Sequence, residues 1–302
     1  MELILAIAVA AVVWWSGTGL VLFAASVGER STGWSMATAS GILPMAFCGL
    51  VFSSELDSFA AAIAAFCSAV LIWGWHELSF LLGYVTGPNK ESCPDDARGF
   101  ERFVLATKTI LHHELAILAT AIGIAAMTWG DVNQTGLLTF MVLWIMRISA
   151  KLNVFFGVPN LVDEWLPKHL EHLKSFFRKG PVGPWFPLSI TLGTGIVIVL
   201  GALALHATAG SGVAFGYGLA AALAAIAVVE HWFLVLPIQD TALWRWVPRA
   251  KQPDGIDQRP SETPAKKQPL RSSASSTQRA PETTYSPSTL SLASRGIAAP
   301  LD

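Results

Sequence analysis

The chain alternates between long apolar stretches and short polar ones. Seven of the apolar stretches approach or exceed the ~20 residues that an α-helix needs to cross ~30 Å of hydrocarbon. A membrane β-strand needs only ~10 residues of alternating character, so these lengths predict helices. The predicted spans are Leu3–Val27, Met36–Phe52, Phe59–Leu82, Phe103–Trp129, Gly136–Gly157, Phe186–His206 and Val213–Pro237.

The polar stretches between the predicted spans differ in charge. The loops after the first, third and fifth spans together hold eight Lys and Arg residues, whereas the loops after the second, fourth and sixth spans hold none. Cytoplasmic loops of membrane proteins collect basic residues. The distribution therefore predicts an N-terminus outside the membrane and a C-terminus in the cytoplasm.

Composition agrees with a membrane protein. Of the 302 residues, 53% are hydrophobic and 14% are charged, the mean hydropathy is +0.51 and the formal net charge is −1. Soluble domains are closer to one quarter charged. Three separate cysteines make no disulfide framework, and no nucleotide-binding loop, catalytic Ser or Cys signature or nucleic-acid-binding patch is visible. We expect an all-α, polytopic helix bundle whose partner is the lipid bilayer and not nucleic acid.

The composition changes near the end of the last span. Residues 240–302 contain eight prolines and many Ser and Thr residues, and their nine Lys and Arg exceed six Asp and Glu. Such a segment has too few apolar residues to offset the entropy lost on ordering. We predict a transmembrane helical bundle at 1–238 and a disordered cytoplasmic tail at 239–302.

Several predicted spans carry ionisable residues, which are costly in lipid and therefore suggest function. Counting along helices at 1.5 Å per residue places them about 10–15 Å from the cytoplasmic end of their spans, in one layer. Three consecutive members, His112 to Glu114, cover about 200° of a helix and cannot all face one centre. The layer consists of His76, Glu77, Lys108, His112, His113, Glu114, Arg147, Lys151, Asn153, Glu230 and His231.

The loop after the fifth span, at about 160–179, predicts an amphipathic helix at the membrane interface. Its large apolar residues recur at three- and four-residue spacing. His169 and His172 are three residues apart and share one face. This helix could cover the polar layer, which makes Glu164, His169 and His172 candidate metal ligands.

Four interpretations of the layer remain open. Three acidic and three basic residues could form a neutral ion-pair network that holds the helices in register. Histidine and carboxylate residues could bind non-haem iron or zinc, although no Glu-x-x-His pair of the di-iron type occurs in the spans. A histidine could be the axial ligand of a tetrapyrrole, since small residues precede His231 by one turn. A proton or solute pathway is the fourth interpretation.

Several segments resemble the PuhE family, the photosynthetic complex assembly protein 2 of purple phototrophic bacteria. The resemblance covers about residues 1–245. It rests on Trp75–Gly83 with Thr86-Gly87-Pro88, on His112–Glu114, on Arg147–Asn160, and on Leu166–Leu170 with Ser175–Phe177.

The resemblance implies a role in assembling the photosynthetic reaction centre and core antenna, in the bacterial inner or intracytoplasmic membrane. The implied partners are reaction-centre or light-harvesting subunits, and the implied ligand is bacteriochlorophyll or a precursor, with haem or iron as other possibilities. The family supplies no catalytic residues. We expect an assembly factor; the alternatives are a metal-dependent membrane oxidoreductase acting on a pigment or lipid precursor, and a non-catalytic scaffold.

From the residues themselves we predict specific roles within the layer. We expect the histidines of the spans to be the ligands, with the glutamates orienting them or neutralising the basic residues. The predicted ligands are His76, His112, His113 and His231; the glutamates are Glu77, Glu114 and Glu230; the basic residues are Lys108, Arg147 and Lys151.

Overall fold

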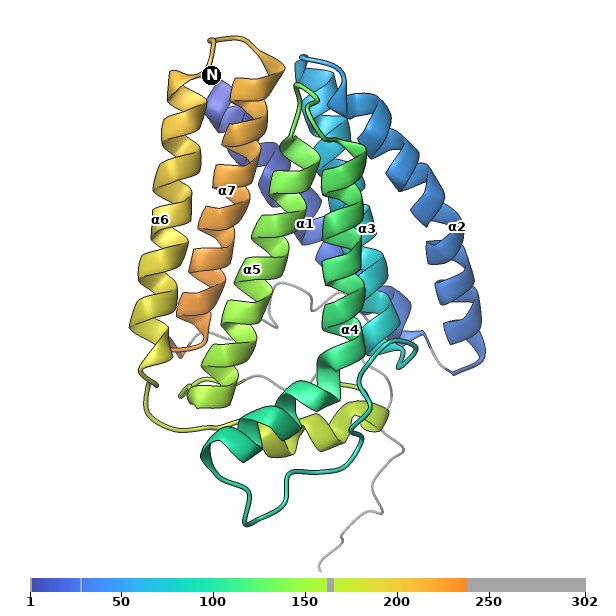
Figure 1. Ribbon diagram of the computed structural model, residues 1–302, viewed down its shortest axis with the longest axis vertical. Helices are drawn as coiled ribbons and strands as arrows, with labels where there is room; N and C mark the ends of the chain where they lie inside the picture. Colours follow the sequence, from blue (N-terminus) through green and yellow to red (C-terminus); the bar gives the residue numbers. More distant parts are fainter. Residues whose placement is uncertain (1, 28, 162–165, 238–302) are drawn as a thin grey trace, which may run out of the picture. The chain divides into compact units, whose positions relative to one another are not determined.

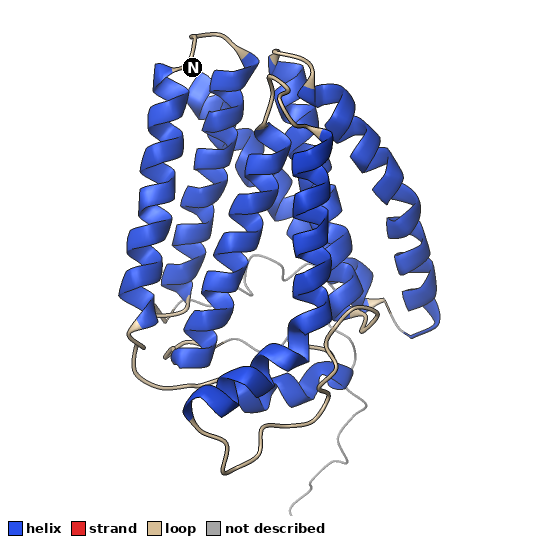
Figure 2. Cartoon of the chain, in the orientation of Figure 1, coloured by secondary structure: helices blue, strands red, loops and turns tan. Residues whose placement is uncertain are grey.

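The computed structural model describes residues 2–27, 29–161 and 166–237. Regular structure within these residues is helical (Figure 2), apart from one isolated parallel bridge between Val158 and Lys179. The predicted tail at 239–302 lies outside the described residues. The helices are α1 (Glu2–Ser26), α2 (Glu29–Ser54), α3 (Phe59–Leu81), α4 (Gly99–Met127), α5 (Thr135–Phe156), the 3₁₀-helix η1 (Lys168–Phe176), α6 (Trp185–His206) and α7 (Gly212–Phe233).

Seven of these described helices are long and apolar enough to cross a membrane. The predicted fold class is therefore confirmed: the chain is a polytopic membrane helix bundle. Two helices begin earlier than predicted, α2 at Glu29 and α4 at Gly99. A helix satisfies its own backbone hydrogen bonds, so it can continue past its apolar stretch. The direction in which the bundle crosses the membrane stays a prediction.

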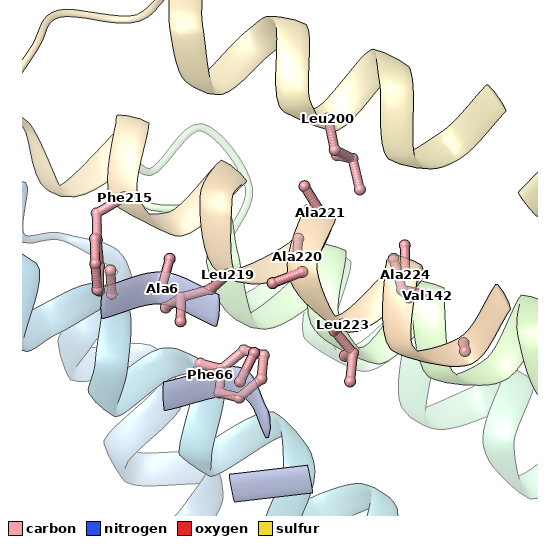
Figure 3. Packing of buried hydrophobic residues seen from close by; sticks show 14 of the residues in the cluster. Ala6, Phe66, Val142, Leu200, Phe215, Leu219, Ala220, Ala221, Leu223 and Ala224 are labelled. Carbon is pink, nitrogen blue, oxygen red and sulfur yellow. The ribbon is translucent and has the colours of Figure 1, made fainter. Parts of the chain in front are cut away.

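The core of the bundle surrounds α7, which packs against α1, α3, α5 and α6. Its buried residues are mostly alanine and glycine, and Figure 3 shows this alanine-rich face of α7 meeting Ala6, Phe66 and Val142. Small residues allow helix backbones to approach closely. Gly216 illustrates the need, because a Cβ atom there would overlap Oγ1 of Thr135 on α5.

The connection from α3 to α4 forms a wedge, Thr86–Asn89, against α4. The backbone N–H of His113 donates to the Thr86 carbonyl (2.8 Å), and the N–H of Asn89 donates to the Lys108 carbonyl (3.3 Å). A segment that inserts into the backbone ladder of a helix bends it. The first turns of α4 accordingly run at an angle to the rest (Figure 1).

The segment predicted as an amphipathic helix at 160–179 is a nine-residue 3₁₀-helix, so its predicted length is wrong. Pro167 stands at its N-cap and has no N–H to donate to an earlier turn. Leu170, Leu173 and Phe176 recur every three residues and are buried, which suits the three-residue turn of a 3₁₀-helix. We call η1 together with the connection 82–98 the cap, because η1 packs against α4 and residues of the connection contact η1.

Candidate functional site

Two ion pairs join α5 to its neighbours inside the bundle. Arg147 pairs with Glu77 of α3, with Nη2 and Oε2 3.1 Å apart. One turn further along α5, Lys151 pairs with Glu114 of α4, with Nζ and Oε1 2.6 Å apart. The indole Nε1 of Trp144 also donates to the second oxygen of Glu114, at 3.0 Å. Four residues of the predicted layer therefore meet between these three helices.

The two pairs differ in exposure. The side chain of Arg147 is 45% exposed and that of Glu77 is 14% exposed. Lys151 and Glu114 are more evenly enclosed, at 24% and 19%. Glu230 of α7 also interacts electrostatically with Arg147, so α7 joins the network. The network thus holds three glutamates, Glu77, Glu114 and Glu230, and two basic residues, Arg147 and Lys151.

His76 and His113 form a buried aromatic pair between α3 and α4. Their ring centroids are 6.4 Å apart, and Phe80 covers His113 with a centroid separation of 4.7 Å. His76 Nε2 shares a hydrogen bond with Oγ1 of Thr120 (3.0 Å). Neither ring nitrogen of His113 has a hydrogen-bond partner among the described residues, and the same holds for Nδ1 of His76. A buried polar atom without a partner costs about 1–3 kcal/mol.

Both ring nitrogens of His231 are hydrogen-bonded to neighbouring residues. Its Nδ1 donates to the Ala227 carbonyl (2.8 Å), and its Nε2 shares a hydrogen bond with Oγ of Ser149 (3.0 Å). Asn153, in the last turn of α5, donates to Oγ of Ser189 on α6 (2.9 Å). These residues link α5 to α7 and α6, and neither ring nitrogen of His231 is free for a ligand.

Lys108 and His112 lie apart from the rest of the predicted layer. Both are exposed on α4, whereas His113, the next residue, is only 1% exposed. His112 and His113 therefore have different surroundings, as expected of consecutive residues on a helix. Lys108 forms no ion pair with the residues that the structure describes, so the network there contains Arg147 and Lys151 but not Lys108.

The cap histidines do not face the layer. His169 is exposed and its ring packs against Gly83, which has a φ of +81°. His172 is half-buried, and burial lowers its pKa; a hydrogen bond with the His169 backbone opposes this shift, and the nearby Lys90 adds to it. The face of η1 that turns inward is apolar: Leu170 and Leu173 pack against Phe80, the residue that covers His113.

The metal site predicted at the cap stays a prediction. Within the described residues no group of three His, Cys, Asp or Glu side chains converges as a metal site would require. Glu164, the third candidate beside His169 and His172, lies outside the described residues.

Several polar partners in the site were not predicted from sequence. Thr120, Trp144, Ser149 and Ser189 each donate to or accept from a residue of the predicted layer. Hydroxyl and indole groups are common in membrane helices, so their residue type alone carries no signal. Trp144 lies three residues before Arg147 and seven before Lys151, and this shared helix face is the pattern that could have revealed it.

A curated relative gives the chain a context. An uncharacterized 30.4 kDa protein in the puhA 5′ region of Rhodobacter capsulatus is 40% identical over 241 residues, which cover 78% of this chain and 87% of the relative. No solved structure matches the chain. Residues 1–254 match the family described as "protein of unknown function (DUF3623)", and the chain belongs to that family.

Proposed function

We propose that this protein is an inner-membrane assembly factor for the photosynthetic reaction centre and core antenna, and that it presents bacteriochlorophyll or a precursor to those complexes. Two observations support the biological role. The motifs from Trp75 to Phe177 resemble the PuhE assembly family. A relative with 40% identity is named for its position in the puhA 5′ region.

The four predicted histidine ligands differ in exposure, and this difference is the observation that supports pigment binding. A tetrapyrrole is a broad, flat ring, and its central metal must reach a ring nitrogen of the histidine. His76 and His113 are buried against each other and Phe80, and both nitrogens of His231 are in use. The side chain of His112 is exposed and has no hydrogen bond to a described residue. We therefore assign the axial contact to His112.

The exposed face of α4 suits such a ring. Leu115 and Ile122 continue the stripe of exposed residues beyond His112, at 51% and 60% exposure. These apolar side chains would contact the body of the ring, while the imidazole of His112 would hold its metal. When bound, the pigment supplies its own light-absorbing chemistry. The chain positions the pigment on the outside of the bundle, where a partner subunit could take it.

The internal network gives this face a rigid support. Glu114 follows His112 by two residues and is held by both Lys151 and Trp144 of α5. His113 is enclosed by Phe80 and His76. The buried part of the predicted layer would then fix the rotation of α4, while His112 on the other side carries the ligand.

An absorption spectrum tests the proposal. We expect full-length protein purified in detergent from a pigment-producing bacterium to carry Soret and red bands. His112→Leu should remove most of both bands without loss of folded protein. His206→Leu is the matched control, since His206 is also exposed but lies at the last residue of α6. Bands that survive His112→Leu would overturn the assignment.

The ion-pair network supports a second candidate, a non-catalytic scaffold. Two ion pairs that join three helices make a bundle suited to docking partner subunits. A colourless protein that still co-purifies with reaction-centre or light-harvesting subunits would establish the scaffold and reject pigment presentation.

A further inference from the structure

We propose that Lys108 binds a carboxylate of the same ligand, so that the site selects tetrapyrroles with a free carboxylate over their esterified forms. This inference rests on the proposed function. It assigns a role to the basic residue of the predicted layer that the internal network does not use.

Lys108 and His112 are placed to contact one molecule. They are four residues apart on α4, which puts them on the same face about 6 Å apart along the axis. Both residues are exposed, whereas Thr109 and His113, their neighbours in sequence, are buried. A ligand lying along this face with its metal at His112 would therefore have Lys108 at its edge.

Lys108 carries a positive charge on the exposed face of α4. Its ammonium group forms no ion pair with a described residue, although Glu101 lies two turns earlier on the same helix. A lone lysine on the surface of a membrane helix is unfavourable unless its ammonium group reaches water or an anion. A carboxylate beside it would receive a charge-assisted hydrogen bond, which is stronger than a neutral one.

The wedge holds the backbone of this part of α4. The Lys108 carbonyl accepts from the N–H of Asn89, and the side-chain amide of Asn89 donates to the Leu105 carbonyl (3.3 Å). Gly87 lies so close that a Cβ atom there would overlap the Lys108 carbonyl oxygen. The backbone under Lys108 is thus fixed, which favours binding because little order is lost.

The face also has the polarity of an amphiphile. Lys108 lies beside the wedge, in the part of α4 that contacts the connection 82–98, and the exposed residues beyond His112 are apolar. A tetrapyrrole acid has its carboxylates on one edge and an apolar remainder. The face of α4 has the same order: a positive charge at Lys108, the metal ligand at His112, and then the apolar Leu115 and Ile122.

Titration with two synthetic probes tests the inference. Full-length protein in lipid nanodiscs would be titrated with zinc protoporphyrin IX and, separately, with its dimethyl ester, following the shift of the Soret band. We expect the free acid to bind about five-fold tighter than the ester, the effect of one ion pair of about 1 kcal/mol. Lys108→Gln should abolish this preference, and Lys108→Arg should retain it.

Lys168→Gln is the matched control, because Lys168 is also exposed but belongs to η1 and not to α4. Comparing each variant with the natural protein, probe by probe, cancels the different solubility of the two probes in lipid. A preference that persists in Lys108→Gln overturns the role of Lys108 and leaves pigment binding intact. If His112→Leu binds each probe as tightly as the natural protein does, the proposed function itself is overturned.

Discussion

At the scale of single residues, the surroundings give each histidine a different role. His231 has both ring nitrogens hydrogen-bonded and joins α7 to α5. His113 is buried with both nitrogens unpartnered among the described residues. His112, its neighbour in sequence, is exposed. Residue type alone made these histidines equal candidates, but only contacts distinguish a structural imidazole from one that a ligand can reach.

Gly87 offers a prediction at this scale. In Gly87→Ala the new Cβ atom would overlap the backbone of Lys108 and Thr109, which cannot turn away as a side chain can. We expect a loss of about 2 kcal/mol or more in the free energy of unfolding, as for overpacked sites. Thermal unfolding in detergent, followed by circular dichroism, measures the loss.

Gly123→Ala is the control for that measurement. Gly123 lies in the same helix, and a Cβ atom there would meet nothing within 4 Å. It should leave the unfolding temperature unchanged or raise it, since alanine favours helix over glycine by up to about 1 kcal/mol. Equal unfolding temperatures for the two variants would show that the wedge does not press on α4.

At the scale of elements, α5 organises the site by presenting different polar groups to different neighbours. Trp144, Arg147 and Lys151 meet the glutamates of α3 and α4. Ser149 and Asn153 bond to α7 and α6. A single helix thus carries hydrogen bonds or ion pairs to four others, because residues three, four and seven apart share a face while those between them point elsewhere.

Double-mutant cycles on the two ion pairs test this arrangement. The Glu114–Lys151 cycle, with Glu114→Gln and Lys151→Met, should give a coupling energy of about 1–3 kcal/mol, because water screens this enclosed pair weakly. The Glu77–Arg147 cycle should give a smaller value, because its charged atoms are 3.1 Å apart instead of 2.6 Å. Unfolding free energies of the single and double variants supply both values. The reverse order of couplings would contradict the closer contact of Glu114 with Lys151.

At the scale of the whole described bundle, the two ends differ in chemistry. The end with the cap carries the basic loops, the wedge and η1, and the polar layer lies nearer to it. At the other end, short connections are held by hydrogen bonds such as that from the Val213 N–H to Asp57 (2.9 Å). The charge difference predicts that the cap is cytoplasmic.

Cysteine labelling tests that orientation. Cys93 lies in the cap, and Glu55→Cys would place a thiol at the other end, in a chain whose span cysteines Cys48 and Cys67 are replaced by alanine. A membrane-impermeant maleimide applied to cells with a permeabilised outer membrane should label position 55 and not Cys93. Lysed cells, in which both sites react, are the control. Labelling of Cys93 alone in unlysed cells would reverse the topology.

The sequence by itself determined the seven spans and the helical class, because an apolar stretch of about 20 residues in lipid must bond its own backbone and has few other ways to do so. It also located the polar layer, since helix rise converts residue number into depth. It could not tell which residues of that layer meet, because pairing depends on how each helix is rotated and where α4 bends. Only the tertiary structure paired Glu114 with Lys151, enclosed His113, and left Lys108 and His112 on the outside.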